Sequence, residues 1–307
     1  MSESAIPKVS IGLPVYNGEQ YIETALQSIL QQDFDDFALV VSDNASTDAT
    51  PDILDRWADK DERVTVHHSE INMGGADNFN KVLQLSTGKY FRWATHDDYL
   101  APSMVSSCVE ALDAAEETCV LVYPQTVIVD GDGNEVEMLS NQLILDSDDP
   151  VERLHEFIRN YGFANAIYGL MRADAIKAVG GLPKYNAGDL TMIAGLALRG
   201  KFLEVPEPLF YRRMHEDMSW RKSKTPEGFA KWFDPNKRWF IVFQAWRLWR
   251  ELVAEVWRSP LSPADKLRAT GVVAYAWPRR EWKRMLKEIA RIPIVVVRQL
   301  RQARSQG

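Results

Sequence analysis

The most constraining feature of this 307-residue sequence is the regular alternation of strand and helix patterns from Lys8 to Pro124. Runs of apolar and β-branched residues predict buried strands, and apolar residues at helical spacing separate them. This alternation is typical of βαβ units, so it predicts a Rossmann-like α/β domain with a doubly wound, mostly parallel sheet. The strands are predicted at 8–16, 37–43, 63–69, 89–95 and 119–124.

The pattern changes after about residue 130. "VIVDGDGNEV" predicts a β-hairpin because Asp-Gly favours a tight turn, and "NAIYGLMR" predicts a strand. From Lys224 onward the pattern is helical, and eight of the ten tryptophans lie between Trp220 and Trp282. We therefore expect a domain over residues 1–220, divided near residue 130, and an α-helical C-terminal extension over 221–307.

The charge of the chain is unevenly distributed. Its net charge of −7 argues against general nucleic-acid binding, yet residues 279–307 carry nine basic and two acidic side chains. The sequence shows no signal-peptide pattern and no apolar run of the roughly 18 residues that span a bilayer. Cys108 and Cys119 lie in apolar surroundings, so we expect core thiols and a reducing, cytoplasmic location.

Polar residues follow three predicted strands, in "PVYNGEQ", "SDNASTD" and "THDD". Ligands of doubly wound sheets bind beyond the carboxyl ends of the strands, so these segments are candidate binding residues. Asp43 can accept hydrogen bonds from an N–H or hydroxyl of a nucleoside. The alternative is that Asp43 only caps its own loop through an Asx turn.

Asp97 and Asp98 place two carboxylates side by side at the end of a strand. Their repulsion is tolerable if a divalent cation compensates it, and Mg²⁺ or Mn²⁺ typically binds carboxylates together with substrate phosphates. The pair therefore suggests a metal that holds a diphosphate. Alternatively, one of these residues caps the helix that begins near Pro102, or both are solvated.

These segments, taken in order, resemble the family 2 glycosyltransferases of the GT-A fold from about Lys8 to Ser219. The resemblance rests on "VSIGLPVYNGEQYIETALQSILQQ", "VVSDNASTDAT", "NMGGADNFNKVLQLSTGKYFRWATHDDYL" and "AGDLTMIAGLALRGKFLEVPEPLFYRRMH". It implies a nucleotide-sugar-binding part over about 1–130 and an acceptor side over about 131–220.

The resemblance also implies roles for individual residues. Asp189 matches the general base, and Asp97 matches the carboxylate that bridges to the metal, with Asp98 as its support and His215 as a distal metal or diphosphate contact. Arg212 and Arg213 are suited to phosphate oxygens, unless they only belong to a solvated polar loop. The nucleotide-binding positions are Pro14, Tyr16, Glu19, Asp43, Asn72, Gly75 and Asn80, to which we add His96 as a residue that could face the diphosphate.

Three positions depart from the usual family pattern. Thr95 stands where many members carry the first Asp of the metal motif, Phe79 where many carry Arg, and Gly188 where many carry Glu. Thr95 and Gly188 keep a second interpretation open, in which the protein binds a nucleotide sugar or acts as a scaffold without catalysis. A sugar-nucleotidyltransferase is disfavoured because no "GxGxR"-like loop follows the first strand.

The residues suggest an inverting transfer from a nucleotide-sugar donor, most simply a UDP-sugar, with Mn²⁺ or Mg²⁺ as cofactor. A metal at Asp97 neutralises the diphosphate leaving group, and Asp189 removes the proton of the acceptor hydroxyl. We expect Asp189 to be ionised because it lies near a helix N-terminus, although it could be a simple helix-start acid. The resemblance implies a glycan or lipid-linked acceptor in bacterial surface-polysaccharide assembly.

The C-terminal helices carry two further expectations. In the first helix an apolar face is predicted opposite Arg247, Arg250, Glu251 and Glu255, which suits a core or homodimer element; the face comprises Trp239, Val242, Phe243, Trp246, Trp249, Val253, Val256 and Trp257. In "RREWKRMLKEIARIPIVVVRQLRQAR" basic residues flank Trp and aliphatic residues, and Pro293 should break or kink the helix. This pattern predicts peripheral contact with the inner face of the cell membrane.

Overall fold

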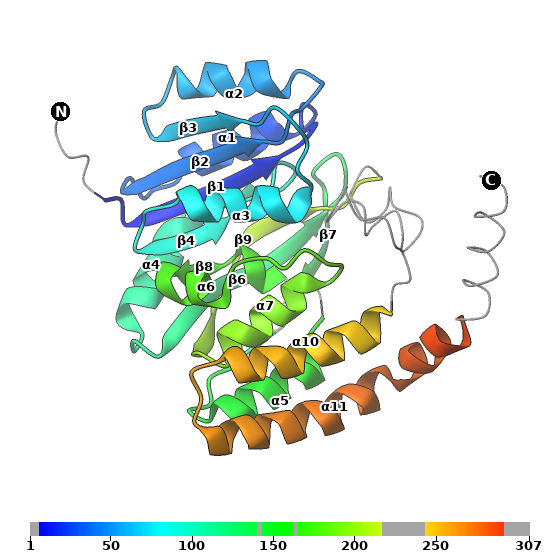
Figure 1. Ribbon diagram of the computed structural model, residues 1–307. Helices are drawn as coiled ribbons and strands as arrows, with labels where there is room; N and C mark the ends of the chain where they lie inside the picture. The colour runs from blue at the N-terminus through cyan, green and yellow to red at the C-terminus, as the bar shows by residue number, and fades with distance from the viewer. Residues whose placement is uncertain (1–5, 140–142, 163–164, 217–242, 292–307) are drawn as a thin grey trace, which may run out of the picture.

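A computed structural model describes residues 6–139, 143–162, 165–216 and 243–291. Its centre is one nine-stranded mixed sheet with the order β3-β2-β1-β4-β8-β6-β9-β5, in which β7 pairs with β6 (Figure 1). The predicted α/β class is confirmed. The strands are β1 (Val9–Val15), β2 (Phe37–Asp43), β3 (Val64–His68), β4 (Tyr90–Trp93), β5 (Tyr99–Leu100), β6 (Cys119–Val129), β7 (Glu135–Leu139), β8 (Leu170–Arg172) and β9 (Lys201–Arg213).

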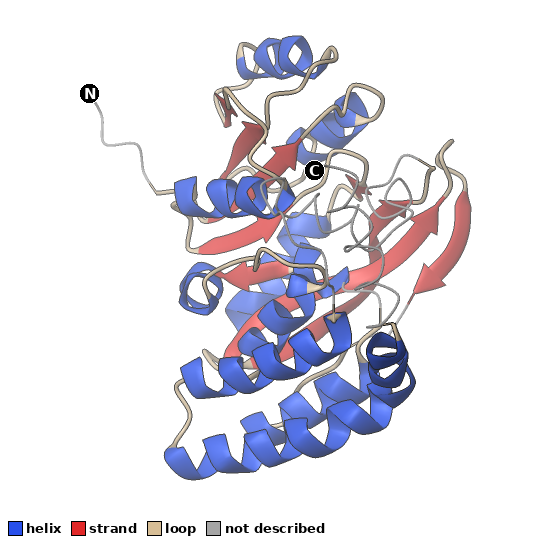
Figure 2. Ribbon diagram, turned by 45° about the vertical axis from the view of Figure 1, so that its right-hand side comes forward, coloured by secondary structure: helices blue, strands red, loops and turns tan. Residues whose placement is uncertain are grey.

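Helices cover both faces of this sheet, as a doubly wound arrangement requires (Figure 2). The predicted apolar stripe of α1 is confirmed, since Ile22, Leu26 and Ile29 are buried. The helices are α1 (Ile22–Leu30), α2 (Thr50–Ala58), α3 (Gly75–Leu85), α4 (Met104–Ala114), α5 (Pro150–Asn160), α6 (Ala173–Val179), α7 (Gly188–Ala197), α10 (Gln244–Arg258) and α11 (Pro263–Ala290), with a 3₁₀ turn η1 (Asn165–Tyr168).

The first four long strands form the parallel half of the sheet. β1 lies between β2 and β4, and β2 pairs with β3, all in parallel. The register sets Val15 opposite Asp43 and Asp43 opposite His68, so these strands end at one edge. This arrangement gathers the loops that follow β1, β2 and β3.

The second half of the sheet is mixed. β8 is antiparallel to both β4 and β6, whereas the long strands β6 and β9 are parallel. The predicted hairpin is confirmed as β6 and β7. The predicted strand at 165–172 is wrong over its first half, because residues 165–168 form the 3₁₀ turn η1. The next residue, Gly169, lies so close to β6 that a Cβ added to it would be 2.5 Å from the Val122 carbonyl oxygen.

Helices α10 and α11 lie side by side against α5 and α7, at the lower edge of the molecule in both ribbon views (Figures 1 and 2). Their apolar side chains share one hydrophobic core with α5, α7 and β6. The described part of the C-terminal extension is therefore packed into the same core as the sheet. The predicted domain boundary at residue 220 lies outside the described residues, as do Trp239, Val242 and Pro293.

The buried face of α10 differs from the predicted one. Trp246 and Trp257 are 38% and 52% exposed, whereas Glu255 is buried. The reason is an ion pair: Arg199 Nη1 approaches Glu255 Oε1 to 2.9 Å, which turns this acidic residue toward α7. The side chains that α10 buries against the core are Ala245, Leu248, Leu252 and Val256.

No helix in the described ranges is both long enough and apolar enough to cross a membrane.

A substitution at Leu252 tests whether α10 is part of the hydrophobic core. Leu252→Ala should lower the free energy of unfolding by about 2–4 kcal/mol, because it leaves a cavity in a position that is 1% exposed. The matched control Leu267→Ala, on α11, removes a side chain that is 65% exposed and should change stability by less than about 0.5 kcal/mol. Chemical denaturation measures both. Equal, small effects would show that α10 does not belong to the core.

Candidate active site

The loops after β1 and β2 are bonded to each other. Asn17 Oδ1 accepts a hydrogen bond from the Thr47 backbone N–H at 2.8 Å, and Glu19 Oε2 accepts one from the Ala49 N–H at 2.8 Å. Asn17 and Ala45 both have positive φ, which costs little for Asn and more for Ala, so the surrounding contacts hold this backbone in place. The two loops thus form one rigid wall at the sheet edge.

Asp43 lies at the bottom of this wall. Its Oδ1 accepts a hydrogen bond from the Ser46 N–H at 3.1 Å, as an Asx turn would, and its Oδ2 lies 3.2 Å from His68 Nδ1. The loop-capping alternative is therefore part of the geometry, but it uses only one of the two oxygens. Pro14 is buried opposite Ser42, and Tyr16 is exposed beyond the end of β1.

The Asn- and Gly-rich loop before α3 reaches the same edge. Asn72 Oδ1 accepts hydrogen bonds from Asn44 Nδ2 at 3.1 Å and from the Gly74 N–H at 2.9 Å, so this loop is joined to the end of β2. Gly75 begins α3. Asn80 lies one turn further along the helix, where both polar atoms of its amide bond the Leu182 backbone. Asn80 thus holds the loop before α7, a position apart from the other predicted nucleotide residues.

Asp97 and His215 are brought together from opposite parts of the chain, with His215 Nε2 3.1 Å from Asp97 Oδ2. Burial alone would raise the pKa of Asp97, but the charge of His96 and the His215 contact outweigh it, so the pKa is lowered. His96 packs against the first loop, where a Cβ on Gly18 would be 2.8 Å from its ring. The predicted metal residues therefore lie next to the predicted nucleotide wall.

Asp98 has a different position from its neighbour. Its Oδ1 accepts the Arg213 backbone N–H at 2.9 Å, and its Oδ2 accepts the Thr95 hydroxyl at 2.5 Å. Burial and then the charge of Asp97 raise the pKa of Asp98. Both oxygens thus bond protein donors, and Asp98 links the motif to β9. Thr95, the departure from the family pattern, supplies one of these donors.

The guanidinium of Arg213 is bonded to backbone carbonyls. Its Nε donates to the Asp97 carbonyl at 3.1 Å and its Nη1 to the Gly131 carbonyl at 2.9 Å. The guanidinium carbon lies 4.7 Å from the centre of the Tyr21 ring and 5.5 Å from that of Tyr99. Backbone carbonyls and aromatic rings thus contact this buried cation, which gives Arg213 a structural role, and its binding to phosphate stays a prediction.

Arg212 points toward the acceptor side. Its guanidinium bonds Asn165 and lies 6.0 Å from the centre of the Tyr168 ring. Burial raises the pKa of Tyr168; the positive charge of Arg212 lowers it, while the carboxylates of Asp98, Asp97 and Asp189 raise it further. The charges of the metal motif, of Arg212 and of the predicted base thus all act on the Tyr168 hydroxyl.

Asp189 lies in the first turn of α7, with its Oδ1 3.1 Å from the Leu190 N–H. Its surface is only partly covered, but dense protein surrounds the carboxyl, and this burial raises its pKa despite the helix N-terminus. The helix N-terminus therefore does not offset the effect of burial on this pKa, and the ionised state of Asp189 stays a prediction. A raised pKa makes the carboxylate a better proton acceptor.

The donor set at Asp97 and His215 is compatible with a divalent cation. One carboxylate and one imidazole suit Mn²⁺, and Mg²⁺ also accepts such a carboxylate when phosphates supply further oxygens. His215 Nδ1 is buried without a hydrogen-bond partner among the described residues. Over the same residues no group of three or more His, Cys, Asp or Glu side chains could hold a metal. The protein would thus supply only part of the coordination shell.

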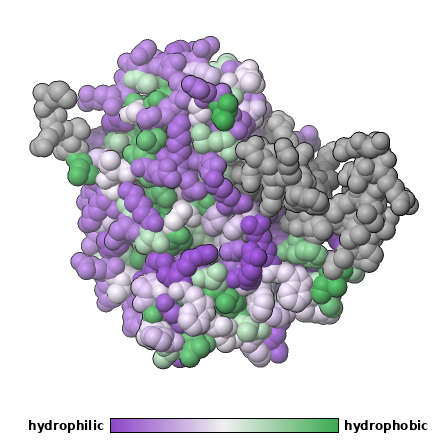
Figure 3. Space-filling view, in the orientation of Figure 1, coloured by the Kyte–Doolittle hydropathy of each residue, from purple (hydrophilic) through white to green (hydrophobic). Residues whose placement is uncertain are grey.

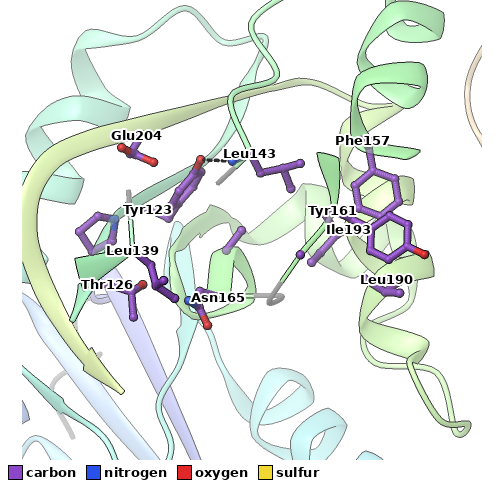
Figure 4. Close-up of a pocket in the computed structure, with 13 residues that line it drawn as sticks. Tyr123, Thr126, Leu139, Leu143, Phe157, Tyr161, Asn165, Leu190, Ile193 and Glu204 are labelled. Atoms are coloured by element: carbon purple, nitrogen blue, oxygen red, sulfur yellow. Dashed lines mark hydrogen bonds between the residues drawn. The ribbon is translucent and has the colours of Figure 1, made fainter. Parts of the chain in front are cut away.

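A small cavity adjoins the acceptor side, between β6, β9, η1, α5 and α7 (Figure 4). It is lined by Tyr123, Asn165, Leu190 and Glu204, among others, and its volume is about 10 Å³. That is about the space of one water, so the cavity cannot hold a sugar.

Sequence reasoning missed several side chains around the site. Tyr21 packs on His215 with ring centres 4.8 Å apart, and Asn165 orients Arg212. His68, for which no role was predicted, contacts Asp43. The only available signal was position: Tyr21 follows the first polar loop, and His68 ends a strand beside that of Asp43. Asn165 carried none, because its segment was predicted as a strand.

Residues 10–179 match the family described as Glycosyl transferase family 2. The chain is 30% identical over 131 residues to the putative teichuronic acid biosynthesis glycosyltransferase TuaG of Bacillus subtilis, covering 43% of this chain and 51% of that protein. It is 27% identical over 141 residues to an uncharacterized glycosyltransferase of Haemophilus influenzae, covering 46% of this chain and 56% of that protein. The chain thus spans about half the length of these relatives.

Solved structures show the same fold. S. aureus TarS 1-349 superposes with a TM-score of 0.63 at 18% identity, over 92% of this chain and 79% of that one. The mannosyltransferase PcManGT of Pyrobaculum calidifontis gives a TM-score of 0.52 at 18% identity, over 95% of this chain and 75% of that one. The predicted GT-A fold is confirmed.

Replacing Arg213 by Ala distinguishes a structural role of this residue from a role in phosphate binding. Arg213→Ala should lower the free energy of unfolding by about 2–4 kcal/mol, because it leaves buried carbonyls without donors. The control Arg250→Ala removes a side chain that is largely exposed and should have little effect. If Arg213→Ala kept wild-type stability in a denaturant titration and lost only nucleotide affinity, the result would support the prediction that Arg213 binds phosphate.

Proposed function

Because the chain belongs to glycosyl transferase family 2, we propose that it is an inverting glycosyltransferase that moves a sugar from a nucleoside diphosphate donor to an acceptor hydroxyl. The observation that carries the proposal is the convergence of three carboxylates. Asp43 lies at the nucleotide wall, Asp97 next to it with His215, and Asp189 across Tyr168 on α7. Taken in this order, the three carboxylates correspond to the nucleobase of the donor, its diphosphate and the acceptor hydroxyl.

The donor is proposed to be a UDP-sugar. Its base would lie against Pro14, Tyr16 and Asp43, with Asn72 and Gly75 beside the ribose. TarS has been solved with UDP and with UDP-GlcNAc, which supports uridine, whereas PcManGT has been solved with GDP-Man. An imide N–H of uracil is the kind of donor that the Asp43 carboxylate accepts.

Asp97 and His215 are proposed to hold Mn²⁺ or Mg²⁺. PcManGT has been solved with Mn²⁺, and the carboxylate and imidazole here fit that ion. When bound, the cation would neutralise charge on the diphosphate leaving group. Asp98 and Arg213 keep Asp97 in place, since they join its loop to β9.

Asp189 is proposed as the general base. Its carboxylate takes the proton of the acceptor hydroxyl while that oxygen attacks the anomeric carbon, and the bond from this carbon to the diphosphate oxygen breaks. A single displacement of this kind inverts the anomeric centre. Gly188, where many family members carry Glu, has a local reason: a Cβ at this position would be 2.6 Å from the Pro183 carbonyl oxygen. A Glu at this position would require the loop to move.

The acceptor is proposed to be a glycan or lipid-linked sugar in bacterial surface-polysaccharide assembly. The name of TuaG supports the pathway class. The surface of α11 supports a location at the cytoplasmic face of the membrane, because Tyr275, Trp282, Leu286 and Ile289 form an exposed stripe at helical spacing. Figure 3 shows hydrophobic side chains at the lower right, over the C-terminal half of α11.

Basic residues border this stripe. Arg279 lies 5.0 Å from the centre of the Tyr275 ring, and Lys283 lies 5.6 Å from that of Trp282. Aromatic and aliphatic side chains flanked by cations are suited to an anionic bilayer surface. A homodimer remains the alternative use of this face, and a scaffold without catalysis remains the alternative function.

Asp189 tests the proposed reaction. Asp189→Asn should lower the rate of sugar transfer by at least about 100-fold, because the amide cannot accept the proton. The measurement is product formation with UDP-sugars, Mn²⁺ and a lipid-linked acceptor.

The matched control is binding of UDP, which Asp189→Asn should leave unchanged because Asp189 lies on the acceptor side. Near-normal transfer by the variant would contradict the base assignment. Binding of UDP-sugars by the wild type without transfer or hydrolysis would favour the scaffold function.

Substitutions in the exposed stripe of α11 test whether this helix contacts a membrane. Replacing Trp282 and Leu286 by Glu should weaken binding to vesicles of phosphatidylcholine and phosphatidylglycerol by more than about 10-fold, because two exposed apolar side chains no longer enter the interface. Val136→Glu, an equally exposed apolar position on β7, is the control. Unchanged co-sedimentation of the double variant, together with a loss of dimer in sedimentation analysis, would assign the stripe to self-association.

A further inference from the structure

His68 lies between two carboxylates at the end of β3. Its Nδ1 is 3.2 Å from Asp43 Oδ2, and its Nε2 is 2.9 Å from Asp55 Oδ1. The three residues come from β2, β3 and α2, and the parallel register of β2 and β3 places Asp43 directly opposite His68. The contact is therefore set by the sheet rather than by a flexible loop.

The geometry determines the protonation of this histidine. Ionised carboxylates only accept hydrogen bonds, so both ring nitrogens must carry a proton for both contacts to form. A neutral imidazole has one lone pair and would have to give up one of the two contacts. Burial alone would lower the pKa of His68, but the two carboxylates outweigh it and raise the pKa above 6.5.

The two carboxylates differ in their access to water. The Asp43 side chain is 3% exposed, whereas that of Asp55 is 65% exposed. Asp55 can therefore exchange its contact for water, but Asp43 depends on protein donors. Among the described residues these donors are the Ser46 N–H on Oδ1 and His68 on Oδ2.

Other charges near His68 are few. His67, on the same strand, has its pKa lowered by burial, then by Lys81 on α3 and by His68. Lys81 itself bonds Ser69. Among the described residues, neither side chain forms a hydrogen bond with Asp43, so both provide a reference for the local electrostatics.

We propose that His68 is a positioning residue for the donor base: as an imidazolium held by Asp55, it fixes and charge-compensates the Asp43 carboxylate that reads the nucleoside. This inference rests on the proposed function, because it assumes that the base binds at Asp43. His68 does not touch the base in this scheme; it acts through Asp43.

The sign of the pH dependence follows from the protonated form. Both His68 contacts are complete below the raised pKa; as the pH rises through it the ring loses its positive charge and one of the two contacts, so Asp43 loses its charge compensation and nucleotide affinity should fall over that range. Replacing a charge-assisted hydrogen bond to a buried acceptor by a neutral one predicts a change of about three- to tenfold in Kd.

The experiment measures Kd for UDP with Mn²⁺ from about pH 5.5 to about pH 8.5, by calorimetry, for the wild type and His68→Gln. Gln can donate one N–H but cannot carry charge. The ionisation of the UDP phosphate is common to both proteins and cancels in the ratio of their Kd values. We expect the Kd of His68→Gln divided by the Kd of the wild type to be about three to ten at the low end of this pH range and to approach about one at the high end.

Two further variants sharpen the test. Asp55→Asn should move the fall in affinity to lower pH, because it removes one of the charges that raise the pKa of His68. His67→Gln should give a ratio of about one throughout, and thermal melts check that all variants fold.

A ratio for His68→Gln that does not vary with pH would overturn the inference, whether its value is one or larger. If UDP then still bound the wild type and Asp43→Asn abolished that binding, the proposed function would stand without the role of His68. Failure of the wild type to bind any nucleoside diphosphate would overturn both.

Discussion

The hydrogen bond from the Arg213 backbone to Asp98 joins the two halves of this protein. Asp98 follows the parallel strands, and Arg213 ends β9, so a contact of 2.9 Å connects segments 115 residues apart. The Arg213 side chain adds bonds to the backbone of Asp97 and Gly131. Because His215 comes two residues after Arg213, this junction also decides that an imidazole faces Asp97. A buried carboxylate with both oxygens bonded is a strong anchor, and its removal would leave several donors unpaired.

The sequence predicted the parallel half well because each element there carries its own period. Strands such as β1 and β2 are continuous apolar runs, and α1 shows the apolar spacing of a helix with one buried face. Asp43 and Asp97 could be identified from the same pattern, since both follow a strand end. The strands and helices of this half, and the position of these two residues at strand ends, could be predicted because the relevant information is local in the chain.

What the sequence did not predict are non-local contacts. Arg213 has the composition of a phosphate ligand, but its surroundings are carbonyls and rings contributed by segments far away in sequence. Glu255 looks like part of a solvated face, yet Arg199 turns it inward. His68 has an ordinary position in β3 and acquires its neighbours only through sheet register and α2. Helical or strand periodicity contains no information about such partners.

The ion pair between Arg199 and Glu255 also has a mechanical meaning. Arg199 follows α7, the helix that carries Asp189, and it donates to the Gly195 carbonyl of α7 as well as to Glu255 of α10. Helix α10 in turn packs on α11. The carboxylate of Asp189 and the exposed stripe of α11 are thus parts of one helical layer. If α11 rests on a membrane, as proposed, that layer would act as a fixed spacer, and helix packing would set the height and tilt of Asp189 above the surface.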